Sequence, residues 1–322
     1  MLFTEEEFQA AASVVYQSMA PTPQYAWPLL ASRLGDEVWV KHENHTPIGA
    51  FKIRGGFYHL SALKEQGDIN GIISATRGNH GQSLAVAGAS VGIPVTIVAP
   101  EGNSVEKNAA MRAQGAELIL TGTDFDEAAG QAKEIAAERG LHMVPSFHRD
   151  MCMGVSTYAR ELFEAVGEID TVYVSIGLGS GICGVITQRD LLGLKTEVVG
   201  VVSDRANAYA LSFEAGNVVT TNAASTFADG MAVRVPDPAA LDIITKGAAR
   251  VVQVSDDEVA EAVRIYYSDT HNVAEGAGAA SLAARIKESA KMAGKRTAVV
   301  LTGGNIDTVW YKMVLNQETP EV

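Results

Sequence analysis

The sequence is poor in cysteine and in positive charge. Its 322 residues include only two cysteines, Cys152 and Cys183, which have neither the density of a disulfide scaffold nor metal-ligand spacing. We therefore interpret both as core thiols. Lysine and arginine number 25 against 38 aspartates and glutamates, which gives a net charge of −13 at pH 7. Proteins that bind nucleic acid usually present a basic face, so we expect no nucleic-acid partner.

Long apolar stretches are also missing. No uninterrupted hydrophobic run reaches the length of a membrane span, and residues 1–20 lack the basic start and apolar core of a signal peptide. We therefore expect a soluble, cytoplasmic protein without a membrane partner. Hydrophobic residues nevertheless make up 47% of the chain and charged residues 20%, so the chain can bury a sizeable core.

Short β-rich runs alternate with longer helical patterns along the chain. The runs are almost continuously apolar, which is typical of strands covered on both faces of a parallel sheet. Residues 125–140 form a helical pattern rich in alanine and glutamate, and the segment from Ser255 to Glu258 has the form of a capping box. The pattern predicts an α/β fold with mostly parallel sheets flanked by helices. The predicted strands lie at residues 37–43, 71–76, 94–100, 116–122, 171–177, 197–203 and 298–304.

Three of the predicted strands end in loops that carry glycine and polar residues. The loops read SIGLGSGICG from residue 175, ATRGNHGQ from residue 75 and LTGGNI from residue 301. Glycines let backbone N–H groups approach an anion, and a helix N-terminus adds partial positive charge, so phosphate is the expected ligand of the first loop. Open parallel sheets bind ligands at the carboxyl ends of their strands. Taken alone, the glycines could instead only permit close packing of strand and helix.

A further segment carries a specific resemblance. Residues 41–56 read KHENHTPIGAFKIRGG, which resembles the KxEN…TGSFKxRGA motif of pyridoxal-phosphate enzymes of the threonine dehydratase and serine racemase family. ATRGNHGQ resembles that family's SxGNHxQ loop, and SIGLGSGICG resembles its phosphate loop. The resemblance implies fold type II, similar to the tryptophan synthase β-subunit, with pyridoxal 5′-phosphate as the cofactor. Further elements follow in the family's order at residues 21–23, 154–157, 226–233, 275–280 and 301–305.

The resemblance also implies roles for individual residues. Lys52 aligns with the lysine that forms the Schiff base and removes the α proton, which requires a desolvated amine. Asn79 would bind the pyridoxal 3-oxygen, and Thr302 would face the ring nitrogen in place of the more usual serine. The other expected cofactor contacts are Phe51, Gly177, Leu178, Gly179, Ser180, Gly181 and Glu275, of which Glu275 could instead simply cap a helix. The expected substrate contacts are Thr76, Arg77, Gly78 and His80.

Domain organisation and assembly are further implications of the resemblance. We expect residues 1–47 and 149–322 to form a large cofactor-binding domain, and residues 48–148 to form a small mobile domain. A homodimer is usual in this family and is expected here. Because the chain ends soon after residue 305, we expect no C-terminal regulatory domain of the kind found in biosynthetic threonine dehydratases.

Arg77 is the most informative departure from the family pattern. In serine racemase a serine at this position acts as acid and base, so an arginine argues against efficient racemisation. A guanidinium is a planar fork that suits a carboxylate. Because the loop already binds the α-carboxylate in the family, we expect Arg77 to bind a second carboxylate, unless it forms an ion pair with an acidic neighbour. The predicted reaction is β-elimination of water from 3-hydroxyaspartate, which gives iminosuccinate and then oxaloacetate and ammonia.

Other functions stay open at this point. The main alternative is a catabolic L-threonine or L-serine dehydratase that yields 2-oxobutyrate or pyruvate and ammonia, with Arg77 as a structural residue. A β-replacement enzyme such as cysteine synthase would resemble TSGNTG where this chain has TRGNHG. A carrier or regulatory protein that binds the cofactor without turnover is opposed by the presence of Lys52 together with an intact GNH loop.

No residue is predicted to bind a metal. Family members that bind magnesium or calcium use an EPxxAxD segment, which aligns with residues 202–208, and its two carboxylate positions are Val202 and Ala208 here. His148 and Asp150 could line a cleft between the lobes, although a solvated turn is the preferred interpretation.

Overall fold

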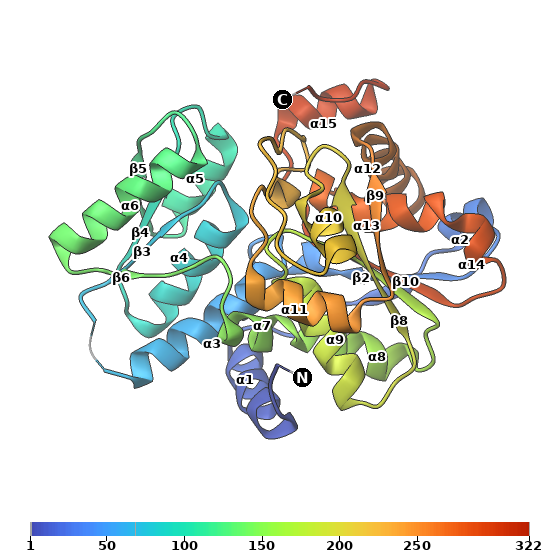
Figure 1. Cartoon of the computed structure of the whole chain (residues 1–322), viewed down its shortest axis with the longest axis horizontal. Coiled ribbons are helices and arrows are strands. Elements are labelled where there is room, and N and C mark those ends of the chain that lie inside the picture. The colour runs from blue at the N-terminus through green and yellow to red at the C-terminus, as the bar shows by residue number, and fades with distance from the viewer. Residues whose placement is uncertain (1, 68, 322) are drawn as a thin grey trace. The chain divides into compact units, whose positions relative to one another are not determined.

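The computed structural model describes residues 2–67 and 69–321, and the protein has an α/β architecture (Figure 1). The chain divides into two compact units, which are described one at a time. The first unit contains the described residues of 1–5, 21–51 and 156–322, and the second contains those of 6–20 and 52–155.

These units have different boundaries from the two expected domains. Residues 48–51 group with the first unit, whereas residues 6–20 and 149–155 group with the second. The ion pair between Glu7 and Arg149 at 2.6 Å is one contact that joins the N-terminal helix to the second unit. The roles given to the domains, cofactor binding and mobility, stay predictions.

The first unit is built on a sheet with the strand order β1-β2-β10-β7-β8-β9. β1 runs antiparallel to β2, and the other neighbouring strands are parallel. Near the middle of the sheet, Val299 pairs with Val40 on one side and with Tyr173 on the other. The strands are β1 (Gln24–Ala26), β2 (Val38–His42), β7 (Thr171–Ser175), β8 (Glu197–Ser203), β9 (Arg250–Val254) and β10 (Thr297–Leu301).

Helices cover both faces of this sheet. They are α2 (Pro28–Leu34), α8 (Thr157–Val166), α9 (Ser180–Leu191), α10 (Ala208–Ala215), α11 (Pro238–Gly247), α12 (Asp256–Thr270), α13 (Gly276–Lys287), α14 (Ser289–Met292) and α15 (Thr308–Leu315), with the short 3-10 helices η1 (Glu43–His45) and η2 (Asp229–Met231). Val199 and Val201 of β8 belong to a core cluster with residues of α12 and α13, whereas a side chain at Gly200 would contact Ile182 of α9. Because side chains alternate along a strand, α9 and α13 lie on opposite faces. The predicted capping box at Ser255 starts α12.

The second unit has a parallel sheet with the strand order β5-β4-β3-β6. Its strands are β3 (Ile72–Ala75), β4 (Val95–Ala99), β5 (Glu117–Leu120) and β6 (His142–Met143). Its helices are α1 (Glu5–Ser18), of which all but Glu5 belongs to this unit, α3 (Lys52–Glu65), α4 (Asn79–Val91), α5 (Val105–Ala113), α6 (Phe125–Arg139) and α7 (Arg149–Val155). Ile73 and Val98 form a core with Ala128 and Ala132 of α6.

Both cysteines are buried thiols, as expected from the sequence. Within the described residues, none of the helices combines the length and the hydropathy that crossing a bilayer requires.

Candidate active site

The loop between β7 and α9 presents backbone N–H groups at the start of a 12-residue helix. A Cβ atom at Gly177 would collide with the carbonyl oxygen of Gly230, and one at Gly179 would lie 2.7 Å from Cβ of Ala240. Gly179 also has a φ of +104°, which L side chains rarely adopt. The N–H groups of a first helical turn have no acceptor within the helix, and the helix dipole adds positive potential. The loop, with the buried Ser180 as the first residue of α9, is therefore suited to a phosphate group.

Two buried tyrosines hold this loop from other parts of the first unit. The Tyr209 hydroxyl donates a hydrogen bond to the carbonyl oxygen of Leu178 at 2.9 Å and accepts one from the N–H of Asp237 at 3.0 Å. The Tyr158 hydroxyl donates to the carbonyl oxygen of Gly181 at 3.1 Å. Sequence reasoning did not identify either tyrosine. Tyr158 directly follows a family-like element of the sequence, whereas no sequence signal marks Tyr209.

The segment before Lys52 pairs with the loop after β10. The N–H of Phe51 donates to the carbonyl oxygen of Thr302 at 3.0 Å, and the N–H of Gly304 donates to the carbonyl oxygen of Gly49 at 2.9 Å. Thr302 is buried and Phe51 is half-buried. The first unit thus places the predicted residues Phe51 and Thr302 side by side, and Lys52 follows Phe51 directly in the chain.

Glu275 lies against the same loop. It occupies the N-cap position of α13 and is 4% exposed, yet its side chain makes no capping hydrogen bond to the backbone of this fully described helix. Its N–H donates to the carbonyl oxygen of Gly303 at 3.1 Å, and its carboxylate fills the space that a side chain at Gly303 would need. The helix-capping role that the sequence left open is therefore not the one observed.

In the second unit, Lys52 is the half-buried first residue of α3. Its carbonyl oxygen accepts a hydrogen bond of 2.7 Å from Oγ of Ser83 on α4. A side chain at Gly56, one turn further along α3, would collide with the same hydroxyl. This close approach of α3 and α4 fixes the start of the helix that carries Lys52.

The loop from β3 into α4 holds the predicted substrate contacts. The N–H of Thr76 donates to the carbonyl oxygen of Val98 at 3.0 Å, and its hydroxyl accepts from the N–H of Gly78 at 3.3 Å. A Cβ atom at Gly78 would lie 2.8 Å from Cδ of Lys107, so a side chain there would require the lysine to shift. The half-buried Asn79 then begins a 13-residue helix. A helix start of this kind suits a carboxylate.

Arg77 stands at the exposed tip of this loop. Asn103 supports its main chain, because Nδ2 of Asn103 donates to the carbonyl oxygen of Arg77 at 3.1 Å and to Oδ1 of Asn108 at 2.7 Å. Within residues 2–67 and 69–321, the guanidinium of Arg77 forms no ion pair and no hydrogen bond. The described residues therefore do not supply the acidic partner that the sequence left open.

His80 is a buried residue in the first turn of α4. Burial, and after it the positive charge of Lys52, lowers the pKa of the imidazole to about 3, so the ring is neutral at pH 7. Its Nε2 has no hydrogen-bond partner among the residues that the structure describes. Such buried, unpartnered polar atoms are uncommon in native proteins, so Nε2 is a candidate contact for a bound ligand.

The KHEN part of the family-like motif is structural. Lys41 is fully buried, and its Nζ donates to the carbonyl oxygen of Thr22 at 2.7 Å and pairs with Glu161. Nε2 of His42 lies 3.0 Å from Nε1 of Trp27 and accepts its hydrogen bond. These residues hold β2 in place. The predicted catalytic lysine, Lys52, lies in the second half of the motif.

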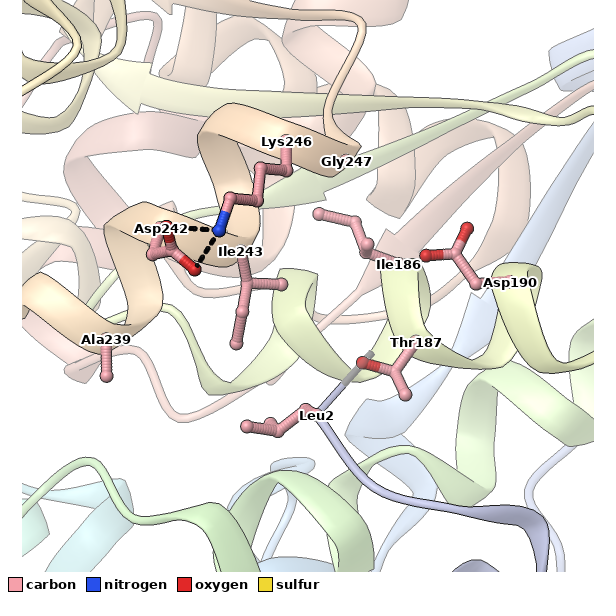
Figure 2. Close-up of a pocket in the computed structure, with 9 residues that line it drawn as sticks. All are labelled: Leu2, Ile186, Thr187, Asp190, Ala239, Asp242, Ile243, Lys246 and Gly247. Carbon is pink, nitrogen blue, oxygen red and sulfur yellow. Dashed lines mark hydrogen bonds and ion pairs between the residues drawn. The ribbon is translucent and has the colours of Figure 1, made fainter.

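A hollow of about 320 Å³ lies elsewhere in the first unit, between α9 and α11 (Figure 2). Lys246 pairs with Asp242 at 2.6 Å, and Figure 2 draws this pair beside the hollow. Its α9 residues come from the C-terminal half of that helix, whereas the phosphate-type loop is at the N-terminal end. We therefore assign no catalytic role to this hollow. Its lining residues are Leu2, Ile186, Thr187, Asp190, Ala239, Asp242, Ile243, Lys246 and Gly247.

Each unit, taken by itself, contains groups whose chemistry suits pyridoxal phosphate. The first unit offers a glycine cradle at a helix start, where crowding by Gly230 and Ala240 excludes side chains and leaves backbone N–H groups for a phosphate. The second unit offers the amine of Lys52, and the unpartnered Nε2 of His80 is a buried polar atom of the kind that a ligand satisfies. An amine is the group that reacts with the cofactor's aldehyde.

Comparison with known proteins bears on both the fold and the cofactor. Residues 15–303 match the family described as pyridoxal-phosphate dependent enzyme. The chain is 31% identical over 317 residues to the L-threonine ammonia-lyase of Thermotoga maritima, which covers 98% of this chain and 79% of that protein. It is 28% identical over 307 residues to the L-threo-3-hydroxyaspartate ammonia-lyase of Saccharomyces cerevisiae, which covers 95% of this chain and 94% of that protein.

A solved structure shows the same architecture. The processed form of threonine deaminase isoform 2 from Solanum lycopersicum matches with a TM-score of 0.91 at 27% identity, over 98% of this chain and 94% of that one. The fold, the family and the cofactor predicted from the motifs are confirmed. Pyridoxal phosphate is the cofactor of this enzyme, and the chain belongs to the family of pyridoxal-phosphate dependent enzymes.

Proposed function

We propose that this enzyme is an ammonia-lyase that removes water from 3-hydroxyaspartate. The observation that carries the proposal is the exposed guanidinium of Arg77, which has no acidic partner among the described residues and stands where α4 begins. The backbone N–H groups at this helix start suit the α-carboxylate, and the planar guanidinium suits a second carboxylate. The relative from Saccharomyces cerevisiae is named for this substrate.

The binding roles divide among few groups. Backbone N–H groups of residues 177–181 would hold the phosphate, Asn79 would hold the pyridoxal oxygen, and the Thr302 hydroxyl would face the ring nitrogen, with Glu275 nearby. Phe51 would pack beside the ring. When bound, pyridoxal phosphate supplies an electron sink for the electron pair that the departing α proton leaves behind. A neutral hydroxyl at the ring nitrogen makes that sink weaker than a carboxylate would, which favours prompt loss of a β-leaving group.

The proton transfers are assigned to this chain's own residues. Lys52 would accept the α proton at Nζ, while Thr76, Gly78 and the first turn of α4 hold the substrate carboxylate. The β carbon–oxygen bond then breaks, and the leaving hydroxide takes up one proton, which balances the α proton accepted by Lys52, and departs as water. The released enamine tautomerises to iminosuccinate, which water converts into oxaloacetate and ammonia. His80, neutral at pH 7, would offer Nε2 as a hydrogen-bond partner without competing for the α proton.

A second candidate is a catabolic L-threonine or L-serine dehydratase. The relative from Thermotoga maritima is named for threonine and is as similar to this chain as the hydroxyaspartate enzyme. In this case the products are 2-oxobutyrate or pyruvate and ammonia, and Arg77 has a structural role. The homodimer and the cytoplasmic location expected from the sequence stay predictions.

The reaction is tested by keto-acid release from the cofactor-loaded enzyme. The substrates are the stereoisomers of 3-hydroxyaspartate, L-threonine, L-serine and D-serine. We expect oxaloacetate from one hydroxyaspartate isomer and little product from threonine. Main release of 2-oxobutyrate or pyruvate would replace the proposal by the second candidate.

The role of Arg77 is tested separately by Arg77→Ala. A charge-assisted bidentate pair is worth roughly 1.5–3 kcal/mol, so kcat/KM for 3-hydroxyaspartate should fall about 10- to 100-fold, and that for serine by less than about 3-fold. Arg112→Ala is the matched control, because Arg112 is an exposed arginine of the same unit. Equal losses on both substrates in Arg77→Ala would remove the second-carboxylate role.

A further inference from the structure

Helix α3 and the start of α7 bring two histidines and an aspartate together in the second unit. His59 lies on α3, two turns beyond Lys52, while His148 directly precedes α7 and Asp150 is its second residue. Oδ2 of Asp150 lies 3.4 Å from Nδ1 of His59 and 3.3 Å from Nδ1 of His148. One ligand atom from each of the three side chains lies within 4.8 Å of the other two.

Hydrogen bonds alone give a poor account of this cluster. Both distances exceed the range of about 2.7–3.2 Å that is usual for N–H···O bonds. The N–H of Asp150 also donates to Nδ1 of His148 at 3.2 Å, so this nitrogen acts as an acceptor and has no proton to give to the carboxylate. Nδ1 of His148 and Oδ2 of Asp150 therefore lie 3.3 Å apart without a proton between them. A cation bound by both atoms would account for their close approach.

The surroundings shield the cluster from solvent. The side chains of His59 and Asp150 are only 5% and 19% exposed. Nε2 of His59 is buried without a hydrogen-bond partner among the described residues, and it can carry the imidazole proton while Nδ1 binds. Arg149 pairs with Glu7 at 2.6 Å, which offsets its charge.

We propose that His59, His148 and Asp150 bind a Zn²⁺ ion. In a tetrahedral zinc site with bonds of about 2.0–2.1 Å, neighbouring ligand atoms lie about 3.3–3.4 Å apart, which matches both distances to Asp150. Imidazole and carboxylate are ligands that zinc accepts, and water can take the fourth position. The side chain of His148 is 42% exposed, so solvent and metal can reach the site.

The ion would join α3 to α7 within the second unit. Because α3 begins at Lys52, this link would restrain the helix that carries the proposed catalytic lysine. The proposal departs from the expectation from the sequence that no residue binds a metal, and the site is separate from residues 202–208.

The test uses the cofactor-loaded protein after removal of metal by a chelator and of unbound cofactor by dialysis. We expect calorimetric titration with ZnCl₂ to give one Zn²⁺ per chain, and titration with Co²⁺ to give the visible absorption of a four-coordinate ion. His148→Ala and Asp150→Asn should each weaken Zn²⁺ binding by more than about 10-fold, because loss of a ligand costs at least as much as loss of a supporting group. His271→Asn is the control, since this exposed histidine of the first unit has a φ of +54° that asparagine tolerates.

Two results would overturn the proposal. One is a folded wild-type protein that takes up no Zn²⁺ at micromolar concentrations. The other is Zn²⁺ binding that both His148→Ala and Asp150→Asn leave unchanged, since the ion would then lie elsewhere. Circular dichroism and thermal melting establish that each variant is folded. Metal binding is read without any substrate, so the outcome is independent of the proposed reaction.

Discussion

The two loops that start α9 and α4 share a backbone plan but differ in what surrounds them. Both follow a buried parallel strand and end at a helix N-terminus. The loop before α9 carries no charged side chain and is fixed by the hydroxyls of the buried residues Tyr158 and Tyr209. The loop before α4 carries the exposed Arg77, held at its main chain by Asn103. In the proposed function, the crowded backbone before α9 binds the cofactor phosphate, whichever substrate is used. The choice of substrate depends instead on the exposed side chain of Arg77.

Breaking the crowded loop should have the largest effect. In Gly179→Ala, the new Cβ atom would lie 2.7 Å from Cβ of Ala240 at a φ of +104°, and strain of this kind costs about 1–3 kcal/mol. The loop must move, so cofactor affinity should fall at least about 10-fold in an absorbance titration. Gly193→Ala is the control, because Gly193 has a φ of +63° and nothing within 4 Å. Equal losses of cofactor in both variants would show that loop geometry does not hold the phosphate.

Loosening the same loop should have a smaller effect that is equal for all substrates. Tyr209→Phe leaves the carbonyl oxygen of Leu178 and the N–H of Asp237 without this partner, which should lower the free energy of unfolding by about 1–2 kcal/mol. The ratio of kcat/KM for 3-hydroxyaspartate to that for threonine should stay constant. Tyr25→Phe, at an exposed tyrosine of the same unit, should change neither quantity. A changed ratio would mean that this loop also selects the substrate.

Loosening the loop that carries Arg77 should affect one substrate and leave the other unchanged. Asn103→Ala removes the hydrogen bond to the carbonyl oxygen of Arg77, a contact worth roughly 1 kcal/mol, so KM for 3-hydroxyaspartate should rise about 3- to 5-fold. KM for serine and the cofactor affinity should stay near the wild-type values. The exposed Asn217 of the first unit provides the control variant, Asn217→Ala. An equal rise in both KM values would contradict the division between the two loops.

The smallest effect concerns stability as a function of pH. The pKa of His80 is about 3 in the folded protein against 6.5 for a free histidine, so the unfolded chain takes up a proton first as the pH falls. The stabilisation is full above pH 6.5 and is lost progressively as the pH falls toward about 3. Between pH 7 and pH 5, the melting temperature of His80→Gln should therefore fall less than that of the wild type. His42, whose pKa burial lowers to about 4, contributes equally to both proteins. Equal falls in melting temperature in the two proteins would show that folding does not protect His80 from protonation.

Much of the fold could be predicted because its strands are long and apolar. Each predicted strand overlaps an observed one, such as Val95–Ala99 within 94–100, although β10 begins at Thr297, one residue before the predicted 298–304. β1 and β6 were missed because strands of three and two residues show no periodicity. β9 was missed because its residues are mostly half-buried at the edge of the sheet. The unit boundaries depend on tertiary contacts such as that between Glu7 and Arg149, which no local pattern reveals.

The candidate site was predictable only where motifs mark it. Lys52 and the loops before α4 and α9 belong to continuous motifs, so resemblance could locate them. Tyr209 acts through a hydroxyl whose partner, Leu178, is set by packing across the unit. His59 and Asp150 are far apart in the chain and meet only because α3 packs on α7. Side chains brought together by tertiary packing lack a sequence signature of their own.

The position of β10 has a consequence for how the protein forms. In the described chain it is the last strand to be synthesised, yet it lies between β2 and β7 in the first unit's sheet. The ribosome must therefore release residues 297–301 before β2 can join the rest of the sheet. The sheet of the second unit is complete at residue 143. The sheet of the unit that carries Lys52 can thus form during translation, while the sheet of the unit with the phosphate-type loop requires residues 297–301.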